Sequence, residues 1–139
     1  MANERILVVE DEHIVALDIK MHLQNYGYVV PAMYATGEEA LANFELIDPV
    51  LVIMDIKLQG RLDGLDTARE IKRRFHVPVV LLTAHADEAT VKRVRETQPF
   101  GYIIKPFEER ELRTAIVVAL SRHEMEQEIV RRERLFFTT

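Results

Sequence analysis

The chain has 139 residues, of which 48% are apolar and 29% charged, a composition typical of one globular domain rather than a disordered or membrane protein. A net charge of −5 argues against nucleic-acid binding by this segment, because neutralising phosphates requires a basic surface. The absence of cysteine excludes disulfides, thiolate metal sites and cysteine nucleophiles. With no bilayer-length apolar run and no signal peptide in residues 1–13, we expect a cytoplasmic protein without membrane partners.

The first two elements are a short apolar run and a helix. Residues 6–9 (ILVV) are apolar throughout, which is typical of a strand covered on both faces of a parallel sheet. In the following segment, 12–26, the side chains of Ile14, Leu17 and Met21 recur at helical spacing. We therefore predict an amphipathic helix with this apolar stripe.

The next two elements are shorter. Residues 28–33 predict a strand, in which Pro31 favours an edge position because proline cannot donate to a sheet ladder. Thr36 and Glu39 have the spacing of a capping box, which predicts a helix from there to about residue 46.

The second half of the chain repeats this alternation of strands and helices. We expect strands at 51–54, 79–82 and 100–104 and helices at 65–75, 87–96 and 108–134. Helices between successive strands imply right-handed crossovers and a parallel sheet. The sequence thus predicts an α/β fold, a single doubly wound (βα)5 domain, for which we infer the strand order 2-1-3-4-5.

The last helix is longer than five strands require. Covering the sheet takes about 12–15 residues, a role that suits Leu112, Ile116 and Ala119. Beyond Ser121 the charges are mixed and apolar residues are sparse. We predict a domain at 1–121 and an extended helix at 122–139 that is a linker or the start of a following module. An exposed tail and a dimer-forming coiled coil both fit this pattern.

Four of the predicted strands lead directly into polar residues. Glu10 and Asp11 follow the first strand, Asp55 the third, Thr83 the fourth and Lys105 the fifth. Because ligands of parallel sheets bind outside the carboxyl ends of the strands, we expect these groups to converge. Three carboxylates, a hydroxyl and an ammonium group suit a divalent cation and a phosphoryl group.

These motifs resemble the receiver domain of two-component response regulators over about residues 4–121. The matching features are Glu10-Asp11, Asp55, Asp63-Gly64, Thr83-Ala84 and Lys105-Pro106, each near a strand end and in the same order. The resemblance implies a flavodoxin-like fold and a phosphorylation-dependent switch. It implies no enzyme in the usual sense, but a regulatory domain that assists its own phosphorylation and dephosphorylation.

The resemblance implies that Asp55 is the phosphoacceptor and receives a phosphoryl group from the phosphohistidine of a histidine kinase or histidine phosphotransfer protein. It also implies a site for Mg²⁺, or Mn²⁺ in its place, formed by Glu10, Asp11, Asp55 and the backbone carbonyl of Lys57. These are oxygen ligands, as Mg²⁺ prefers.

Further roles follow from the same resemblance. Lys105, the Thr83 hydroxyl and the Ala84 N–H would stabilise the phosphoryl group, and the bond before Pro106 would be cis. Thr83 and Tyr102 would form a switch that changes the face of the fourth helix, fifth strand and fifth helix. A half-buried strand tyrosine without a switching role is the simpler alternative for Tyr102.

The loop after Asp55 departs from the family pattern. Most receivers have Met-Pro where this chain has Leu58-Gln59, and one residue fewer before Asp63. Lys57 and His85 lie two residues after Asp55 and Thr83, where side chains flank the path of the hydrolytic water in receivers. Both are candidates to set the lifetime of the phosphate, although His85 could equally be an ordinary exposed loop residue.

The expected partners also follow from the resemblance. A homodimer would use the helix-four, strand-five and helix-five face or the C-terminal helix. Residues 131–139 resemble the start of a PAS sensor module, so the parent protein could be a receiver–PAS sensor histidine kinase with further domains in the same chain.

Two other functions share part of this pattern. Haloacid-dehalogenase-type phosphatases also use an aspartate after a parallel strand, but they need a second one two residues later, where this chain has Lys57. A flavodoxin-like cofactor binder needs a phosphate-cradling loop after the first strand. Here residues 10–12 are acidic and would repel a phosphate that lacks a metal.

Overall fold

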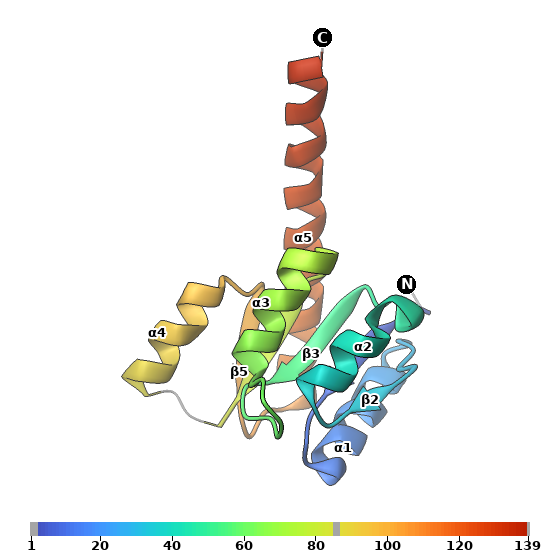
Figure 1. Ribbon diagram of the computed structural model, residues 1–139. Helices are drawn as coiled ribbons and strands as arrows, with labels where there is room; N and C mark the ends of the chain where they lie inside the picture. Colours follow the sequence, from blue (N-terminus) through green and yellow to red (C-terminus); the bar gives the residue numbers. More distant parts are fainter. Residues whose placement is uncertain (1–2, 85–86, 139) are drawn as a thin grey trace.

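The computed structural model describes residues 3–84 and 87–138, with side chains as far as Leu135. Its five strands are parallel in the order β2-β1-β3-β4-β5, as inferred from the sequence (Figure 1). The elements are β1 Ile6–Val9, α1 His13–Asn25, β2 Met33–Tyr34, α2 Gly37–Ile47, β3 Leu51–Asp55, α3 Gly64–Phe75, β4 Val79–Thr83, α4 Glu88–Thr97, β5 Gly101–Ile104 and α5 Glu109–Thr138.

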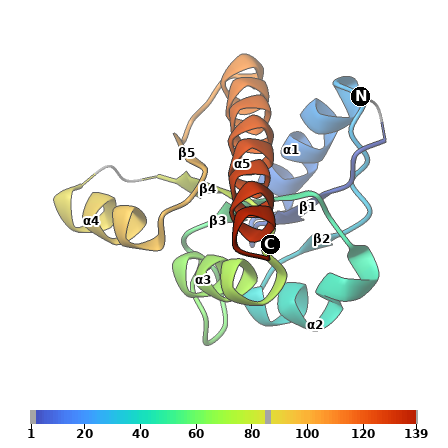
Figure 2. The same ribbon diagram turned by 90° about the horizontal axis from the view of Figure 1, so that it is seen from above.

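Helices cover both faces of the sheet, and two apolar cores result (Figure 2). Helices α1 and α5 pack on one face, where Leu112, Ile116 and Ala119 of α5 are buried as predicted. Helices α2, α3 and α4 contribute to the core on the other face. Strands β1, β3 and β4 are buried along their whole length, since alternate side chains enter the two cores.

The buried face of α1 differs from our prediction. Ile14, Leu17 and Met21 are exposed, and the side chains that reach the core are Ala16, Ile19 and Leu23. Both sets have the same helical spacing, so periodicity alone could not choose between them. Packing of α1 against the sheet selects the second set, which joins the core on that face.

The second strand is also shorter and later than predicted. β2 contains only Met33 and Tyr34, while Val29 forms an isolated parallel bridge with Arg5. Pro31 lies between these two pairings and cannot donate to the ladder, which explains the interruption. The predicted position at the edge of the sheet is correct.

Side chains cap the starts of α2, α3 and α4, and the cap of α2 is the predicted one. The Thr36 hydroxyl accepts a hydrogen bond from the Glu39 N–H at 3.1 Å, and the same hydroxyl donates to the Glu39 carboxylate at 3.0 Å. Asp63 caps α3 and Asp87 caps α4 through their side chains. These polar side chains satisfy N–H groups that a helix start leaves without partners.

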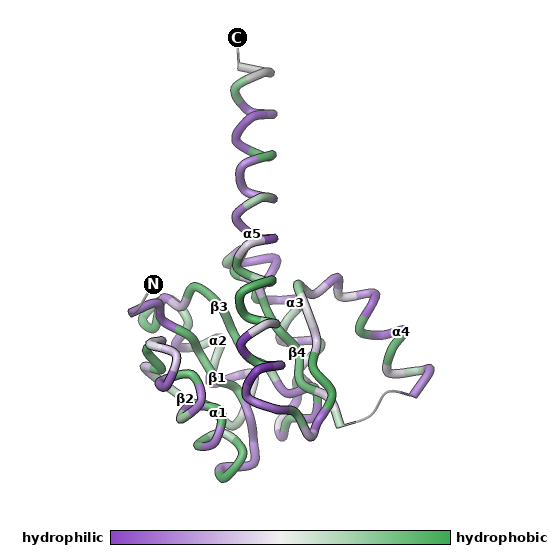
Figure 3. Tube along the Cα trace, turned by 180° about the vertical axis from the view of Figure 1, so that it is seen from behind, coloured by the Kyte–Doolittle hydropathy of each residue, from purple (hydrophilic) through white to green (hydrophobic). Residues whose placement is uncertain are grey.

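Two helices on the β5 side give the molecule its outline. α4 stands away from α5, and the second half of α5 projects from the domain as a single rod (Figures 1 and 3). The ring of His123 contacts the edge of Phe100 where α5 leaves the domain, and the described side chains beyond it are exposed. Among the described residues, no helix has the length and apolar character needed to cross a membrane.

Candidate phosphoacceptor site

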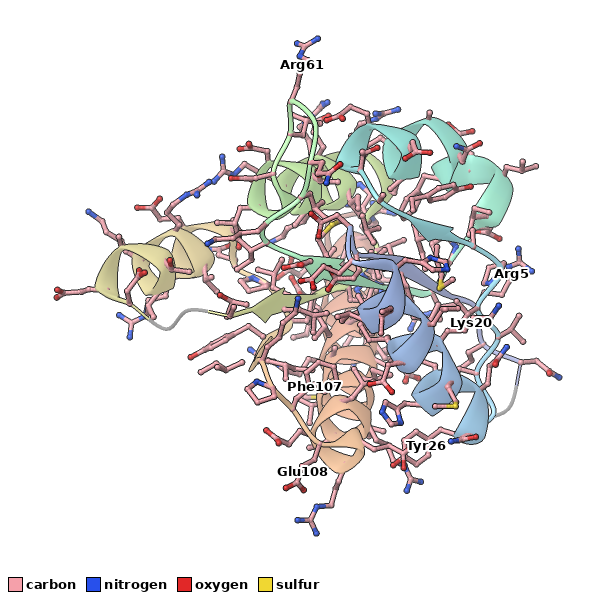
Figure 4. The ribbon with its side chains drawn as sticks, turned by 90° about the horizontal axis from the view of Figure 1, so that it is seen from below. Arg5, Lys20, Tyr26, Arg61, Phe107 and Glu108 are labelled. Carbon is pink, nitrogen blue, oxygen red and sulfur yellow. The ribbon has the colours of Figure 1, made fainter. Side chains whose placement is uncertain are left out.

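Backbone hydrogen bonds between neighbouring strands bring the predicted site residues to one edge of the sheet. The Glu10 N–H donates to the Tyr34 carbonyl at 2.9 Å, and the Lys105 N–H donates to the Thr83 carbonyl at 2.8 Å. The register aligns Asp55 with Leu82, next to Thr83. Figure 4 views the molecule from below, the side on which the strands end, with the labelled Phe107 and Glu108 in the loop that leads into α5.

Three carboxylates form a compact cluster at this edge. Each of Glu10, Asp11 and Asp55 contributes one carboxylate oxygen, and these three oxygens lie within 4.8 Å of one another. Glu10 and Asp55 are buried, whereas Asp11 is partly exposed. An oxygen-rich group of this size suits a hard divalent cation that retains some of its waters.

Lys105 joins the two buried members of this cluster. Its ammonium group lies 2.8 Å from Glu10 Oε1 and 3.0 Å from Asp55 Oδ2. Burial by itself lowers the pKa of Lys105, but these two hydrogen bonds outweigh that effect, and the pKa is raised. The ammonium group is therefore a fixed positive charge beside Asp55. The Lys105–Pro106 peptide bond is cis.

The surroundings of the Glu10 carboxyl group disfavour its charged form. Its side chain has no exposed surface. Burial first, and then the hydrogen bond with the Asp55 carboxyl group, raises the pKa of Glu10 to about 7, although Lys105 and the Glu12 N–H act in the opposite direction. Crowded acids with a raised pKa are common at functional sites.

The loop after β3 is held tightly against the site. Lys57 N–H donates to Asp55 Oδ1 at 3.3 Å, and Gly64 N–H donates to the Ile56 carbonyl at 2.7 Å. A Cβ on Gly64 would lie 1.9 Å from the Asp55 carbonyl oxygen, so only glycine allows α3 to begin this close to the strand. The Leu62 N–H is tied to Glu38 of α2 at 2.8 Å.

The site opens into a cavity of about 240 Å³. Its lining contains Asp11, Asp55, Lys57, Thr83, Ala84 and Lys105. Thr83 is buried, and Ala84 is exposed next to it. The predicted lifetime residue His85 lies outside the described residues. Tyr102 does not line this cavity but a separate groove between α4 and α5.

Three residues that line this cavity, Glu12, Ile56 and Thr90, were not predicted from the sequence, and Ile56 lies there as the direct neighbour of Asp55. Glu12 lines it and binds Glu10 through its backbone, and Thr90 lines it from the first turn of α4. The run of three acids at 10–12 was a usable signal for Glu12. Thr90 carried none, because its place depends on how α4 packs.

The sequence matches the response regulator receiver domain family over residues 6–130. This chain belongs to that family. Its fold and strand order are those of the receiver domain, and the chain is a phosphorylation-dependent signalling domain with a regulatory role. This confirms the family resemblance drawn from the strand-end motifs.

Two curated relatives illustrate the likeness. The transcriptional regulatory protein PdtaR of Mycobacterium tuberculosis is 39% identical over 118 residues, which is 85% of this chain and 57% of that protein. The probable transcriptional regulator ycf27 of Cyanophora paradoxa is 36% identical over 121 residues, 87% of this chain and 50% of that protein. This receiver domain therefore matches only about half of each relative.

Solved structures agree. The signal receiver domain of a modulated diguanylate cyclase from Desulfovibrio desulfuricans has a TM-score of 0.84 and 31% identity, covering 89% of this chain and 98% of that one. The N-terminal domain of a response regulator/sensory box/GGDEF protein from Carboxydothermus hydrogenoformans has a TM-score of 0.80 and 37% identity, covering 88% and 98%.

Proposed function

We propose that Asp55 accepts a phosphoryl group from the phosphohistidine of a histidine kinase or a histidine phosphotransfer protein. An Asp55 oxygen forms a bond to phosphorus as the phosphorus–nitrogen bond of the donor breaks, which leaves an acyl phosphate. The observation that carries this proposal is the position of Asp55. It is the one member of the cluster that both opens to the cavity and contacts the Lys105 ammonium group.

The cluster fits Mg²⁺, or Mn²⁺ in its place, because three carboxylate oxygens lie close enough to surround one ion. Glu10, Asp11, Asp55 and the backbone carbonyl of Lys57 would hold it. The ion would supply positive charge that offsets the repulsion between the acids and the incoming phosphoryl group.

Three further groups would stabilise the phosphoryl group. Lys105 keeps its positive charge beside Asp55, and Thr83 and Ala84 line the same cavity with a hydroxyl and a backbone N–H to offer. All three would offer donors to the phosphoryl oxygens. Lys57 also lines the cavity and would, with His85, influence how long the phosphate lasts.

The signal would reach partners through the α4–β5–α5 side. Thr83 moving toward the phosphoryl group would allow Tyr102, which is 50% exposed, to change its orientation. This face or the projecting part of α5 would form a homodimer, or contact a PAS or kinase domain in the same protein. Residues 1–121 would be the receiver unit and 122–139 the connector. The phosphatase and flavin-binding alternatives gain no support from the matches.

The test of the phosphoacceptor is Asp55→Asn. Incubation with acetyl phosphate and Mg²⁺, followed by intact-mass spectrometry, should show one added phosphoryl group on the parent chain and none on the variant. Asp63→Asn serves as the matched control, since asparagine also caps helices and Asp63 lies outside the carboxylate cluster. Labelling of Asp55→Asn at another residue would refute the assignment.

The switch has its own test. Beryllofluoride with Mg²⁺ mimics the phosphorylated aspartate, and the backbone NMR signals of residues 87–115 should then shift, with those of Tyr102 among them. Unchanged signals on this face, with Asp55 demonstrably modified, would refute the switch while leaving the phosphoacceptor in place.

A further inference from the structure

The loop between β3 and α3, residues 56–63, leads away from Asp55 and passes the start of α2. Its first residue is fixed to the sheet, because the Ile56 N–H donates to the Leu82 carbonyl at 3.0 Å. Farther along, Lys57, Gln59, Gly60 and Arg61 are exposed, and Figure 4 shows Arg61 projecting from the tip of the loop. Because so much of the loop is exposed, its shape depends on contacts with other elements more than on burial.

Glu38, in the first turn of α2, contacts this loop with both of its carboxylate oxygens. Its Oε1 accepts a hydrogen bond from the Leu62 N–H at 2.8 Å. A Cβ on Gly60 would lie 2.3 Å from its Oε2, so the loop backbone passes directly against that oxygen. Gly60 has a φ of +96°, which glycine adopts without strain. The second half of the loop is therefore folded around the Glu38 carboxylate.

The start of α2, which carries Glu38, is closely packed against its neighbours. Thr36, the residue before the helix, forms an isolated parallel bridge with Gln59 of the loop. A Cβ on Gly37 would lie 1.9 Å from the Thr67 hydroxyl oxygen, so the first turn of α2 lies directly against α3. Glu38 therefore reaches the loop from a well-fixed position, and its contact limits where the loop can lie.

An acidic residue in the first turn of a helix has a simpler explanation, a favourable interaction with the helix dipole. In α2 the cap itself is formed by Thr36 and Glu39, whose side chains bind each other. The Glu38 carboxylate turns instead to Leu62, which lies 24 residues away in the sequence. A hydrogen bond to a charged acceptor is stronger than one between neutral groups, so this contact is well suited to hold an exposed loop.

We propose that Glu38 is a positioning residue for the phosphoacceptor site, which holds the β3–α3 loop so that the backbone of Lys57 is in place for the divalent cation. Lys57 lies at the site end of the loop, where its N–H donates to Asp55 Oδ1 at 3.3 Å and the residue lines the cavity. Leu62 lies only five residues farther along. The inference rests on the proposed function in taking the Lys57 carbonyl as a ligand of Mg²⁺.

The expected effect follows from the fraction of chains in which the loop is held. An ion that needs the Lys57 carbonyl binds to that fraction, so its apparent Kd rises as the fraction falls. Losing a hydrogen bond to a charged acceptor is enough to change such a fraction by about tenfold. Asp55 and Lys105 contact each other through β3 and β5 and do not depend on Glu38. Removal of Glu38 should therefore weaken metal binding and spare phosphoryl transfer once the ion is bound.

Three variants separate the hydrogen bond from the charge. Glu38→Ala removes the contact, Glu38→Gln keeps an oxygen that can accept from Leu62, and Glu39→Ala removes an equal charge one residue away. Isothermal titration with Mg²⁺ should give a Kd about tenfold higher for Glu38→Ala and a Kd near that of the parent chain for the other two. An equal rise for Glu38→Ala and Glu38→Gln, or for Glu38→Ala and Glu39→Ala, would overturn the proposal.

Amide hydrogen exchange measures the loop in the absence of metal. In Glu38→Ala the N–H groups of Lys57 and Leu62 should exchange about tenfold faster, because the loop opens more often. The N–H of Val52, which is bonded to the Pro78 carbonyl inside the sheet, should keep its rate. Equal acceleration at Val52 would show a general loss of stability instead of a released loop, and would refute the role of Glu38.

Phosphorylation separates this inference from the proposed function. At saturating Mg²⁺, acetyl phosphate should label Asp55 in Glu38→Ala as fast as in the parent chain. At Mg²⁺ concentrations well below the Kd of the parent chain, labelling of the variant should be about tenfold slower. A parent chain that binds no Mg²⁺, or is not labelled at Asp55, would refute the proposed function. A parent chain that does both, with an unchanged Kd for Mg²⁺ in Glu38→Ala, would refute the role of Glu38 alone.

Discussion

The strand-end site is closely packed, whereas the α4–α5 groove is open to solvent. In the site, buried charges from three strands contact one another at 2.8–3.0 Å. In the groove, α4 stands off and apolar side chains such as Tyr102 and Ile104 remain exposed. The chemistry thus sits on the rigid part of the fold, and the surface that must respond to it sits where little packing has to be broken.

A substitution at Gly64 should disrupt the close packing of the site more than any other change proposed here. Gly64→Ala would place a methyl carbon 1.9 Å from the Asp55 carbonyl oxygen, which forces the end of β3 or the start of α3 to move. We expect a loss of about 2–3 kcal/mol, since overpacking outweighs the better helix propensity of alanine. Urea denaturation measures this loss, and labelling of Asp55 should fall with it.

Gly101→Ala is the matched control on the open side. A Cβ at Gly101 meets no atom within 4 Å, and its backbone does not require glycine. Its stability should stay the same or rise by up to about 1 kcal/mol, because alanine restricts the unfolded chain. Equal losses in the two variants would contradict the contrast between a packed site and an open β5 side.

The site holds three carboxylates and one ammonium group, so we expect a divalent cation to stabilise the fold. Mg²⁺ at about ten times its Kd should stabilise the domain by about 1.4 kcal/mol through mass action. Thermal unfolding with and without the ion measures this gain. Asp11→Asn should lose it while remaining at least as stable without Mg²⁺, because one of three crowded carboxylates is gone. An equal gain in the variant would show that the ion binds elsewhere.

The smallest effect concerns the attachment of α4. Arg93 lies 2.7 Å from Asp63 of the β3–α3 connection. Burial alone would raise the pKa of Asp63, but the Asp66 N–H and Arg93 outweigh it and lower the pKa below its usual value. A lowered carboxyl pKa stabilises the fold above the unfolded-state pKa of about 3.9, and this contribution disappears as the pH falls through the folded value.

Arg93→Met should therefore cost less than about 1 kcal/mol at pH 7, since both side chains are partly exposed. The difference from the parent chain should shrink in acid as Asp63 is protonated. Denaturation at a series of pH values measures it, with Arg69→Met on the exposed side of α3 as control. A stability difference that grows as the pH falls would contradict this prediction.

Local sequence was sufficient where one residue decides one contact. The Thr36 side chain caps its helix as its spacing from Glu39 predicts, and the apolar runs at β1, β3 and β4 are buried. Prediction from local sequence failed where two sets of residues have the same helical spacing. On α1, Ile14 and Ala16 begin two stripes of equal spacing, and only packing against the sheet selected the stripe that begins at Ala16.

The sequence by itself determined the order of strands and helices and which polar groups follow each strand, because periodicity and caps act over a few residues. The tertiary structure decided that Lys105 bridges Glu10 and Asp55, residues that lie 95 and 50 positions away. It also decided that α4 leaves β5 uncovered. Both depend on how distant elements pack, and no pattern within one segment records that.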